Sequence, residues 1–201
     1  MKKVLVLVVA AMMATMSATA QQRYEDNRHE VAVSYGIMSN SQWLNSVIMT
    51  MNIFEGLTPV KGSAFGPISA EYFYHANSWL GVGAIFSFGQ VTTQYNLAID
   101  NDTEVYTGKN TSYTLMPAVK FNWFRRQHFG MYSKVGAGVM MCNMKAIPAD
   151  PFEKTDSETG FGFNWQVSAL GIEFGGTQFR GFVEGGFGEQ GIAVAGLRYM
   201  F

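Results

Sequence analysis

Eight stretches of this sequence alternate between apolar residues and polar or small ones with a period of two, the pattern of a β-strand with two unlike faces. In 111–123, for example, Leu115, Val119 and Phe121 fall on one face and Lys120 on the other. The stretches are 28–38, 66–76, 78–91, 111–123, 128–141, 161–174, 179–188 and 190–201. A strand that crosses a membrane at a tilt near 45° needs about 9–11 residues, and these stretches are long enough. The pattern predicts an all-β chain.

The first residues have the composition of a secretory signal rather than of a strand. A basic start at Lys2 and Lys3 is followed by an apolar run and then by the small-residue sequence Ala-Thr-Ala. The apolar run is shorter than the roughly 18 residues that a membrane-spanning helix needs. We expect residues 1–20 to be removed on secretion, leaving an N-terminal periplasmic segment, 21–27, ahead of one domain over 28–201.

Composition separates this chain from typical soluble domains. Charged residues make up only 14% of the sequence, against about 25% in ordinary globular domains. Aromatic residues also reach 14%, yet no long apolar run follows the signal. A transmembrane β-barrel has this composition because its apolar residues are spread over alternate positions. With a formal net charge of −1 and no basic stripe, the sequence predicts no nucleic-acid partner.

The connections between the stretches alternate in length. Three are short (76–78, 124–127 and 175–178), and three are long (39–65, 92–110 and 142–160). Outer-membrane barrels have short periplasmic turns and longer external loops, so this alternation predicts an eight-stranded antiparallel up-and-down barrel with both termini in the periplasm. The last connection, around "GEQG", is shorter than an external loop is expected to be.

Alternation alone does not choose between a membrane barrel and a soluble sandwich or lipocalin-like barrel. A soluble fold would place the apolar face inside, with Phe121, Trp123 and Trp165 in its core. A membrane barrel would turn the same side chains toward lipid, with rings near the strand ends at the interface. The signal, the loop lengths and the aromatic residues near strand ends favour the membrane barrel.

The chain ends in "LRYMF", with Tyr199 and Phe201 at alternate positions. This ending resembles the closing strand of bacterial outer-membrane barrels. Together with the eight strands, the whole mature chain resembles the small OmpA/OmpX-type barrels without a periplasmic domain. The resemblance implies that Tyr199 and Phe201 form an assembly signal read by the barrel-assembly machinery. We expect a monomer in the bacterial outer membrane, in contact with outer-membrane lipids and lipopolysaccharide.

Charged residues on the opposite face of the strands would point into the barrel. They are Glu71, Lys120, Lys134, Arg180, Glu184 and Arg198. The interior of an eight-stranded barrel is just wide enough for side chains to fill it. Because an unpaired buried charge is costly, these charges should pair, which predicts a polar network that plugs the lumen. The alternative is a narrow ion path along the same residues.

A helical pattern interrupts the first long connection, at 41–55. The residues with helical spacing are Trp43, Leu44, Val47, Ile48, Met51 and Phe54. The apolar face of such a helix in an external loop is expected to be buried against another surface. That surface is the barrel mouth, the lipid interface or a partner. We expect the helix to act as a lid over the mouth.

The sequence offers little for catalysis. His29, His75 and His128 lie at strand ends that the topology places at the periplasmic rim, and no Gly-x-Ser-x-Gly sequence occurs. "GFGEQG" resembles a dinucleotide-binding sequence but precedes a strand rather than a helix. The sequence therefore predicts no enzyme, cofactor or metal, but an integral outer-membrane barrel with a structural or surface-interaction role. Two alternatives stay open: a narrow pore or apolar-ligand transporter gated by the 41–55 helix, and a lipid-modifying enzyme with a Ser/His/acid cluster near the external rim.

Overall fold

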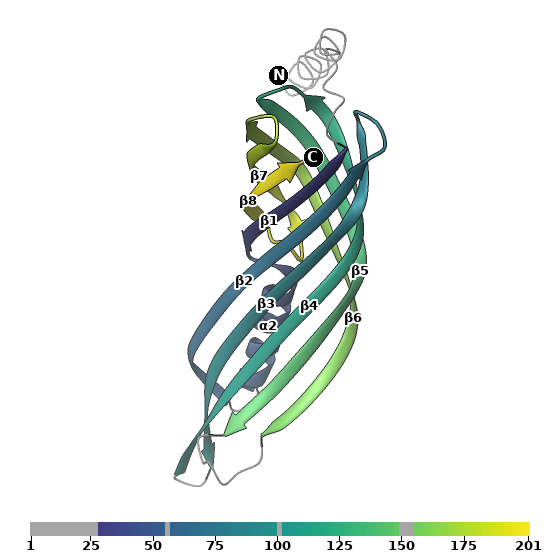
Figure 1. Cartoon of the computed structure of the whole chain (residues 1–201). Helices are drawn as coiled ribbons and strands as arrows, with labels where there is room; N and C mark the ends of the chain where they lie inside the picture. The colour runs from purple at the N-terminus through teal and green to yellow at the C-terminus, as the bar shows by residue number, and fades with distance from the viewer. Residues whose placement is uncertain (1–27, 55–56, 100–101, 149–154) are drawn as a thin grey trace, which may run out of the picture.

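Eight antiparallel strands close into a barrel in the computed structural model, which describes residues 28–54, 57–99, 102–148 and 155–201 (Figure 1). Each strand pairs with the next in sequence, and β8 pairs with β1. The predicted fold class is confirmed. The predicted signal and the segment 21–27 lie outside the described residues.

The strands differ greatly in length. They are β1 (His29–Ile37), β2 (Leu57–His75), β3 (Leu80–Ile99), β4 (Asp102–Arg125), β5 (Phe129–Pro148), β6 (Asp156–Gly175), β7 (Phe179–Gly188) and β8 (Ala193–Met200). A helix, α2 (Asn40–Phe54), lies between β1 and β2, as predicted. No helix in the described part of the chain has the length and apolar character that crossing a bilayer requires.

The long connections were predicted as loops, and for much of their length this is wrong. Most of 92–110 forms a hairpin that continues β3 and β4 as far as the pair Ile99 and Asp102. Strands β5 and β6 continue in the same way beyond 141 and before 161. These extensions are rich in threonine and other β-forming residues but lack apolar alternation, so a search for half-apolar strands stops too early.

The barrel is therefore taller on one side than on the other. Strands β2 to β6 have 19 to 24 residues, whereas β1, β7 and β8 have 8 to 10. We call the part of the tall side that rises beyond β1, β7 and β8 the extended sheet; it comprises 57–65, 91–99, 102–111, 142–148 and 156–162. Figure 1 shows α2 beside this sheet, at the opposite end of the barrel from the final residues of β8. We call these two ends the helix end and the turn end.

The predicted short turns are confirmed, and all three lie at the turn end. The barrel closes there through backbone hydrogen bonds between His29 and Phe201, 2.8 Å and 2.9 Å long. The rings of these two residues also stack, with centroids 5.4 Å apart. The last residue of the chain thus belongs to the seam between the first and last strands.

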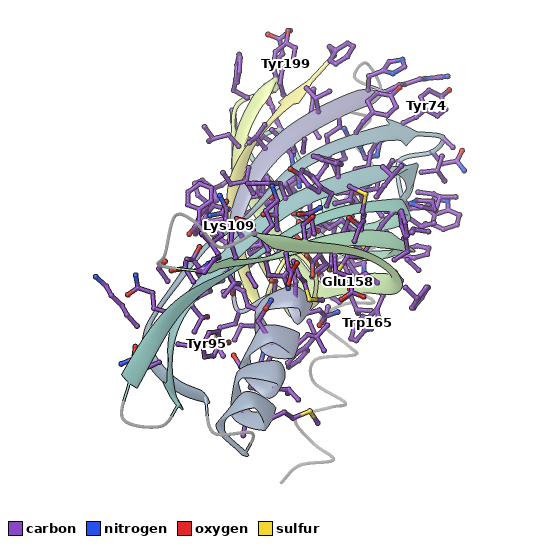
Figure 2. The ribbon with its side chains drawn as sticks, turned by 90° about the horizontal axis from the view of Figure 1, so that it is seen from below. Tyr74, Tyr95, Lys109, Glu158, Trp165 and Tyr199 are labelled. Atoms are coloured by element: carbon purple, nitrogen blue, oxygen red, sulfur yellow. The ribbon has the colours of Figure 1, made fainter. Side chains whose placement is uncertain are left out.

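The outer wall of the barrel is apolar and aromatic. Phe121, Trp123 and Trp165, which a soluble fold would bury, are exposed by 38%, 51% and 39%. Tyr74 and Tyr199 mark the turn end of this wall in Figure 2. The soluble alternative is therefore wrong, because the apolar faces point outward and the polar faces inward.

Candidate functional site

Polar and charged side chains converge on the lumen from all eight strands. The buried carboxylates, lysines and arginines among the described residues are Glu30, Glu71, Glu173, Glu184, Glu189, Lys120, Lys134, Arg180 and Arg198. All six charged residues that the sequence predicted for the lumen are in this set, and each is at most 4% exposed. Three carboxylates were missed: Glu30, Glu173 and Glu189.

Glu30 and Glu173 organise the charges near the turn end. The Nζ of Lys120 donates to both carboxylate oxygens of Glu30, at 2.8 Å and 2.9 Å. His75 Nε2 lies 2.9 Å from the same carboxylate. Glu173 accepts from Arg180 at 2.5 Å and also from Arg198. Each carboxylate thus meets more than one basic group, which lowers the cost of burying these charges.

The ring of Tyr132 contacts two basic side chains in the lumen, Lys120 and Arg198. Lys120 Nζ is 4.1 Å from the centre of its ring, and the guanidinium carbon of Arg198 is 4.6 Å from it. The Tyr132 hydroxyl accepts from Arg198 Nη2 at 2.7 Å and donates to Glu184 Oε1 at 2.6 Å. Cation–π contacts and hydrogen bonds therefore hold this ring across the lumen.

Lys134 links the central residues to the next layer. Its Nζ donates to Glu71 at 2.6 Å and to Glu184 at 2.9 Å. Glu184 also accepts from the hydroxyl of Ser168 at 2.6 Å, and Gln190 donates to Glu71 at 2.6 Å. One ammonium is thus shared by two buried carboxylates, whose remaining hydrogen bonds come from neutral donors; Glu184 also lies 4.0 Å from Arg198 Nη2.

Glu189 forms the layer nearest the helix end. Its carboxylate accepts from the backbone N–H of Ser41 at 3.1 Å, from the Ser41 hydroxyl at 2.6 Å and from Asn164 at 2.9 Å. Ser41 lies in the first turn of α2, where backbone N–H groups have no partner within the helix and carboxylates are favourable. The short "GEQG" connection therefore folds back into the lumen and holds the start of α2.

The apolar residues predicted to form the lid are largely exposed wherever the structure describes their side chains. Trp43, Leu44, Val47 and Met51 are exposed by 46% to 62%, and the side chains of Ile48 and Phe54 lie outside the described set. The polar face of α2 packs inward instead: Asn45 accepts from Asn110 of β4 at 2.9 Å, and Gln42 donates to the Gly66 carbonyl of β2 at 2.7 Å.

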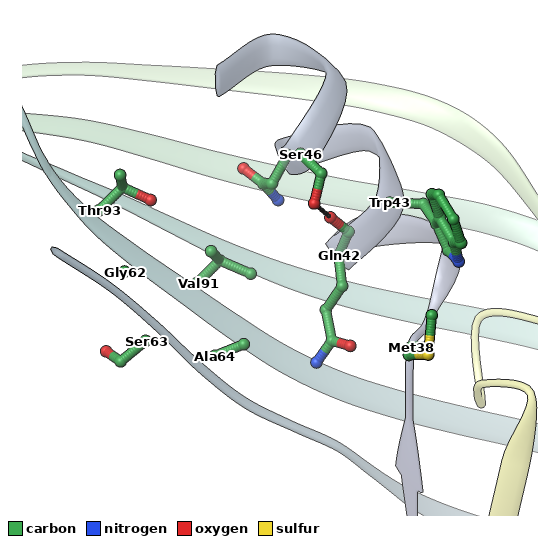
Figure 3. Close-up of a pocket in the computed structure, with 10 residues that line it drawn as sticks. Met38, Gln42, Trp43, Ser46, Gly62, Ser63, Ala64, Val91 and Thr93 are labelled. Atoms are coloured by element: carbon green, nitrogen blue, oxygen red, sulfur yellow. Dashed lines mark hydrogen bonds between the residues drawn. The ribbon is translucent and has the colours of Figure 1, made fainter. Parts of the chain in front are cut away.

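A groove of about 410 Å³ separates α2 from the inner face of the extended sheet. Gln42 and Trp43 line it on the helix, and Gly62, Val91 and Thr93 line it on the strands (Figure 3). No charged side chain is among its lining residues.

The three missed carboxylates had different signals in the sequence. Glu30 alternates with Ala32 and Ser34 along β1 and could have been found from that periodicity. Strict alternation from the inward-facing Ser168 would place Glu173 on the outer face. A register shift between Ser168 and Leu170 reverses the two faces, so Glu173 points into the lumen. Glu189 lies in a turn, where strand periodicity says nothing.

The described histidines lie toward the turn end. His29 Nδ1 lies 2.8 Å from the Tyr72 hydroxyl, His75 contacts Glu30, and His128 Nδ1 lies 3.0 Å from the Gly175 carbonyl. Near Ser41 and Glu189, at the helix end, no histidine stands among the described residues. Those residues also contain no group of three or more His, Cys, Asp or Glu side chains that could hold a metal ion.

Comparisons with known proteins agree with this architecture. Residues 7–188 match the family described as "Outer membrane protein beta-barrel domain". Two crystal structures of Ail, the attachment invasion locus protein of Yersinia pestis, are similar, each with a TM-score of 0.41. One, in complex with the heparin analogue sucrose octasulfate, is 15% identical over 86% of this chain and 96% of Ail. The other is 14% identical over 88% and 96%. No curated protein matches the chain.

Proposed function

The chain belongs to the outer membrane protein beta-barrel domain family, and on that premise we propose that it is a non-enzymatic surface-interaction protein of the bacterial outer membrane. The helix end faces the cell exterior, the turn end faces the periplasm, and the ion-paired lumen is closed to ions. The protein is a monomer, secreted with a cleaved signal and inserted by the barrel-assembly machinery.

The extended sheet is the observation that carries this proposal. In β2, residues 57–65 pair with β3 only, and in β6, residues 156–164 pair with β5 only. The sheet therefore presents two strand edges with unpaired backbone groups, which can add a strand from another chain. The uncharged, apolar face of α2 adds further surface for contact at the same end.

The lumen supports closure rather than conduction. A pore or transporter needs a continuous path past Glu71, Lys120 and Arg198. These three side chains are buried and ion-paired or hydrogen-bonded across the lumen. An ion that passed would have to displace several charge-assisted contacts at once. This arrangement favours a plug over the pore alternative.

The positions of the histidines support a non-enzymatic role. A lipid-modifying enzyme would need a nucleophile, a base and an orienting group within hydrogen-bond reach at the helix end. Ser41 and Glu189 meet there, but the described histidines lie toward the other end. The Ser41 hydroxyl donates to a carboxylate that also holds the start of α2, which is a structural role.

Cysteine labelling on intact cells tests the orientation. We expect a membrane-impermeant maleimide to label Thr155→Cys, an exposed position just before β6, and to label Arg126→Cys, in a short turn, only after the outer membrane is permeabilised. Native Cys142 is buried, and a Cys142→Ala background removes its signal. The reverse labelling pattern would contradict the proposed orientation.

Adhesion assays test the surface role. Cells that display the protein should adhere to at least one member of a panel of immobilised polypeptides. Gly62→Pro, which blocks one free edge by removing a backbone donor, should reduce that adhesion, and Gly62→Ala, whose Cβ meets no atom within 4 Å, should not. Equal adhesion by cells with and without the wild-type protein across the panel would contradict a surface-interaction role.

A further inference from the structure

Two lysines stand directly opposite each other on neighbouring strands of the extended sheet. Lys109 of β4 pairs with Lys145 of β5. Both have the parity of the outward face, because the buried positions of these strands, Ser112 and Cys142 among them, have the other parity. Lys145 is exposed and Lys109 half-buried. Directly opposite side chains have Cβ atoms roughly 5 Å apart, and like charges at that spacing destabilise a sheet.

Nothing on the described outward face compensates for this repulsion. Neither lysine takes part in an ion pair among the described residues. The flanking residues on the same face are Thr92, Thr107, Thr111, Asn143, Ile147 and Ser157. All are uncharged, and five of them carry hydroxyl or amide groups. The described carboxylates of the extended sheet, Asp156 and Glu158, have the parity of the inner face. Among the described side chains of the sheet, the carboxylates thus lie on the inner face and the lysines on the outer face.

The distance of the lysine pair from the apolar, lipid-facing wall indicates which layer of the membrane the two lysines reach. On β4, outward residues from Trp123 to Tyr113 are aromatic or apolar, followed by Thr111 and then Lys109. With about 3.3 Å per residue and a tilt near 40°, the apolar segment spans roughly 25 Å, the usual height of a barrel's apolar band. By the same measure Lys109 lies roughly 10 Å beyond Tyr113. That height corresponds to the headgroup region, into which lysine side chains can extend.

We propose that Lys109 and Lys145 bind the phosphate groups of lipopolysaccharide in the outer leaflet. Two ammonium groups side by side complement a phosphate, and the surrounding hydroxyl and amide groups can donate to its remaining oxygens or to sugar hydroxyls. A bound phosphate would also remove the repulsion between the lysines. The choice of lipopolysaccharide rests on the proposed orientation, in which the extended sheet leaves the outer leaflet.

Lipid binding by the purified, folded barrel tests the site. Wild-type protein in detergent micelles is titrated with lipopolysaccharide, and bound lipid is counted by native mass spectrometry. Lys109→Gln/Lys145→Gln should weaken binding about tenfold or more. Lys109→Arg/Lys145→Arg, which keeps both charges, should bind at least as well as wild type. Lys61→Gln is the matched control, since Lys61 has the outward parity on β2 but faces Gln94, and it should bind nearly as wild type.

Two further probes distinguish the source of the phosphate. Lipopolysaccharide whose phosphates have been removed enzymatically should bind the wild-type protein as weakly as intact lipopolysaccharide binds the double Gln variant. Inorganic phosphate should compete only weakly, because it brings no acyl chains to the lipid-facing wall. Equal binding by wild type and the double Gln variant would overturn the proposal, as would equal binding of both lipids. A wrong orientation would appear separately, as reversed cysteine labelling on cells.

Discussion

Ser41 donates two hydrogen bonds to the buried carboxylate of Glu189, one from its backbone N–H and one from its hydroxyl. Ser41 opens a helix that is connected to β1, whereas Glu189 follows the last residue of β7. The contact therefore ties α2 to the opposite side of the barrel seam. It also explains why so short a connection as "GEQG" occurs at the end where longer loops are expected.

Glu189→Gln should loosen the start of α2. The amide accepts fewer hydrogen bonds than the carboxylate and loses the favourable charge at the helix N-terminus. Hydrogen bonds to charged groups are worth about 1.5–3 kcal/mol, so amide exchange in the first turns of α2 should quicken at least about tenfold. Hydrogen-exchange mass spectrometry measures this. Ser46→Ala, which removes a hydroxyl bond to the Gln42 carbonyl within the helix, should change exchange far less; wild-type exchange rates in Glu189→Gln would contradict the assignment.

Lys134→Met should destabilise the barrel severely. It leaves Glu71 and Glu184 without their shared ammonium group, and removing one partner of a buried ion pair typically costs about 3–5 kcal/mol. Urea unfolding in lipid vesicles, followed by gel mobility, measures the loss. Lys134→Met/Glu71→Gln/Glu184→Gln should recover part of it, because no buried charge is then unpaired. If the single variant unfolds at the wild-type urea concentration, the ion pairs do not hold the lumen together.

Gly171→Ala should disturb the central layer. A Cβ at this position would clash with the Cζ of Tyr132, whose ring contacts Lys120 and Arg198. Overpacking of this kind costs about 1–3 kcal/mol. Gly185→Ala is the control, since a Cβ there meets no atom within 4 Å. The two variants should differ in unfolding midpoint, and equal midpoints would show that the Tyr132 ring can move aside.

Sequence patterns predicted the strands where one face meets lipid and the other the lumen, because only there do apolar and polar residues alternate. They did not predict the extended sheet, because polar residues occur on both of its described faces and its strands lack regular apolar alternation. In the lumen, Lys120, Lys134 and Arg198 followed from alternation alone. Glu173 did not, because the register shift after Ser168 reverses the faces. The hydrogen bonds between Glu189 and the start of α2 join segments far apart in the sequence, and no local pattern predicts them.

Phe201→Ala should impair assembly in cells more than stability in vitro. The Phe201 ring stacks on His29 and lies 5.8 Å from the ring of Tyr199, but it is 49% exposed, so its loss should cost little once the barrel is closed. We expect less folded protein in the outer membrane, while purified protein still refolds. Phe161→Ala, at an exposed outward position far from the terminus, is the control and should assemble normally. Equal amounts of both variants in the outer membrane would contradict an assembly role for Phe201.

The closed lumen is the central claim, and ion conductance tests it most directly. Wild-type protein, refolded and checked for the heat-modifiable gel mobility of a closed barrel, is incorporated into planar lipid bilayers in concentrated potassium chloride. The account predicts no steady current, because ion-paired or hydrogen-bonded charges occupy the lumen from Glu30, near the turn end, to Glu189, at the first turn of α2. Reproducible single-channel steps from the same heat-modifiable protein would contradict it and would favour a pore gated by α2.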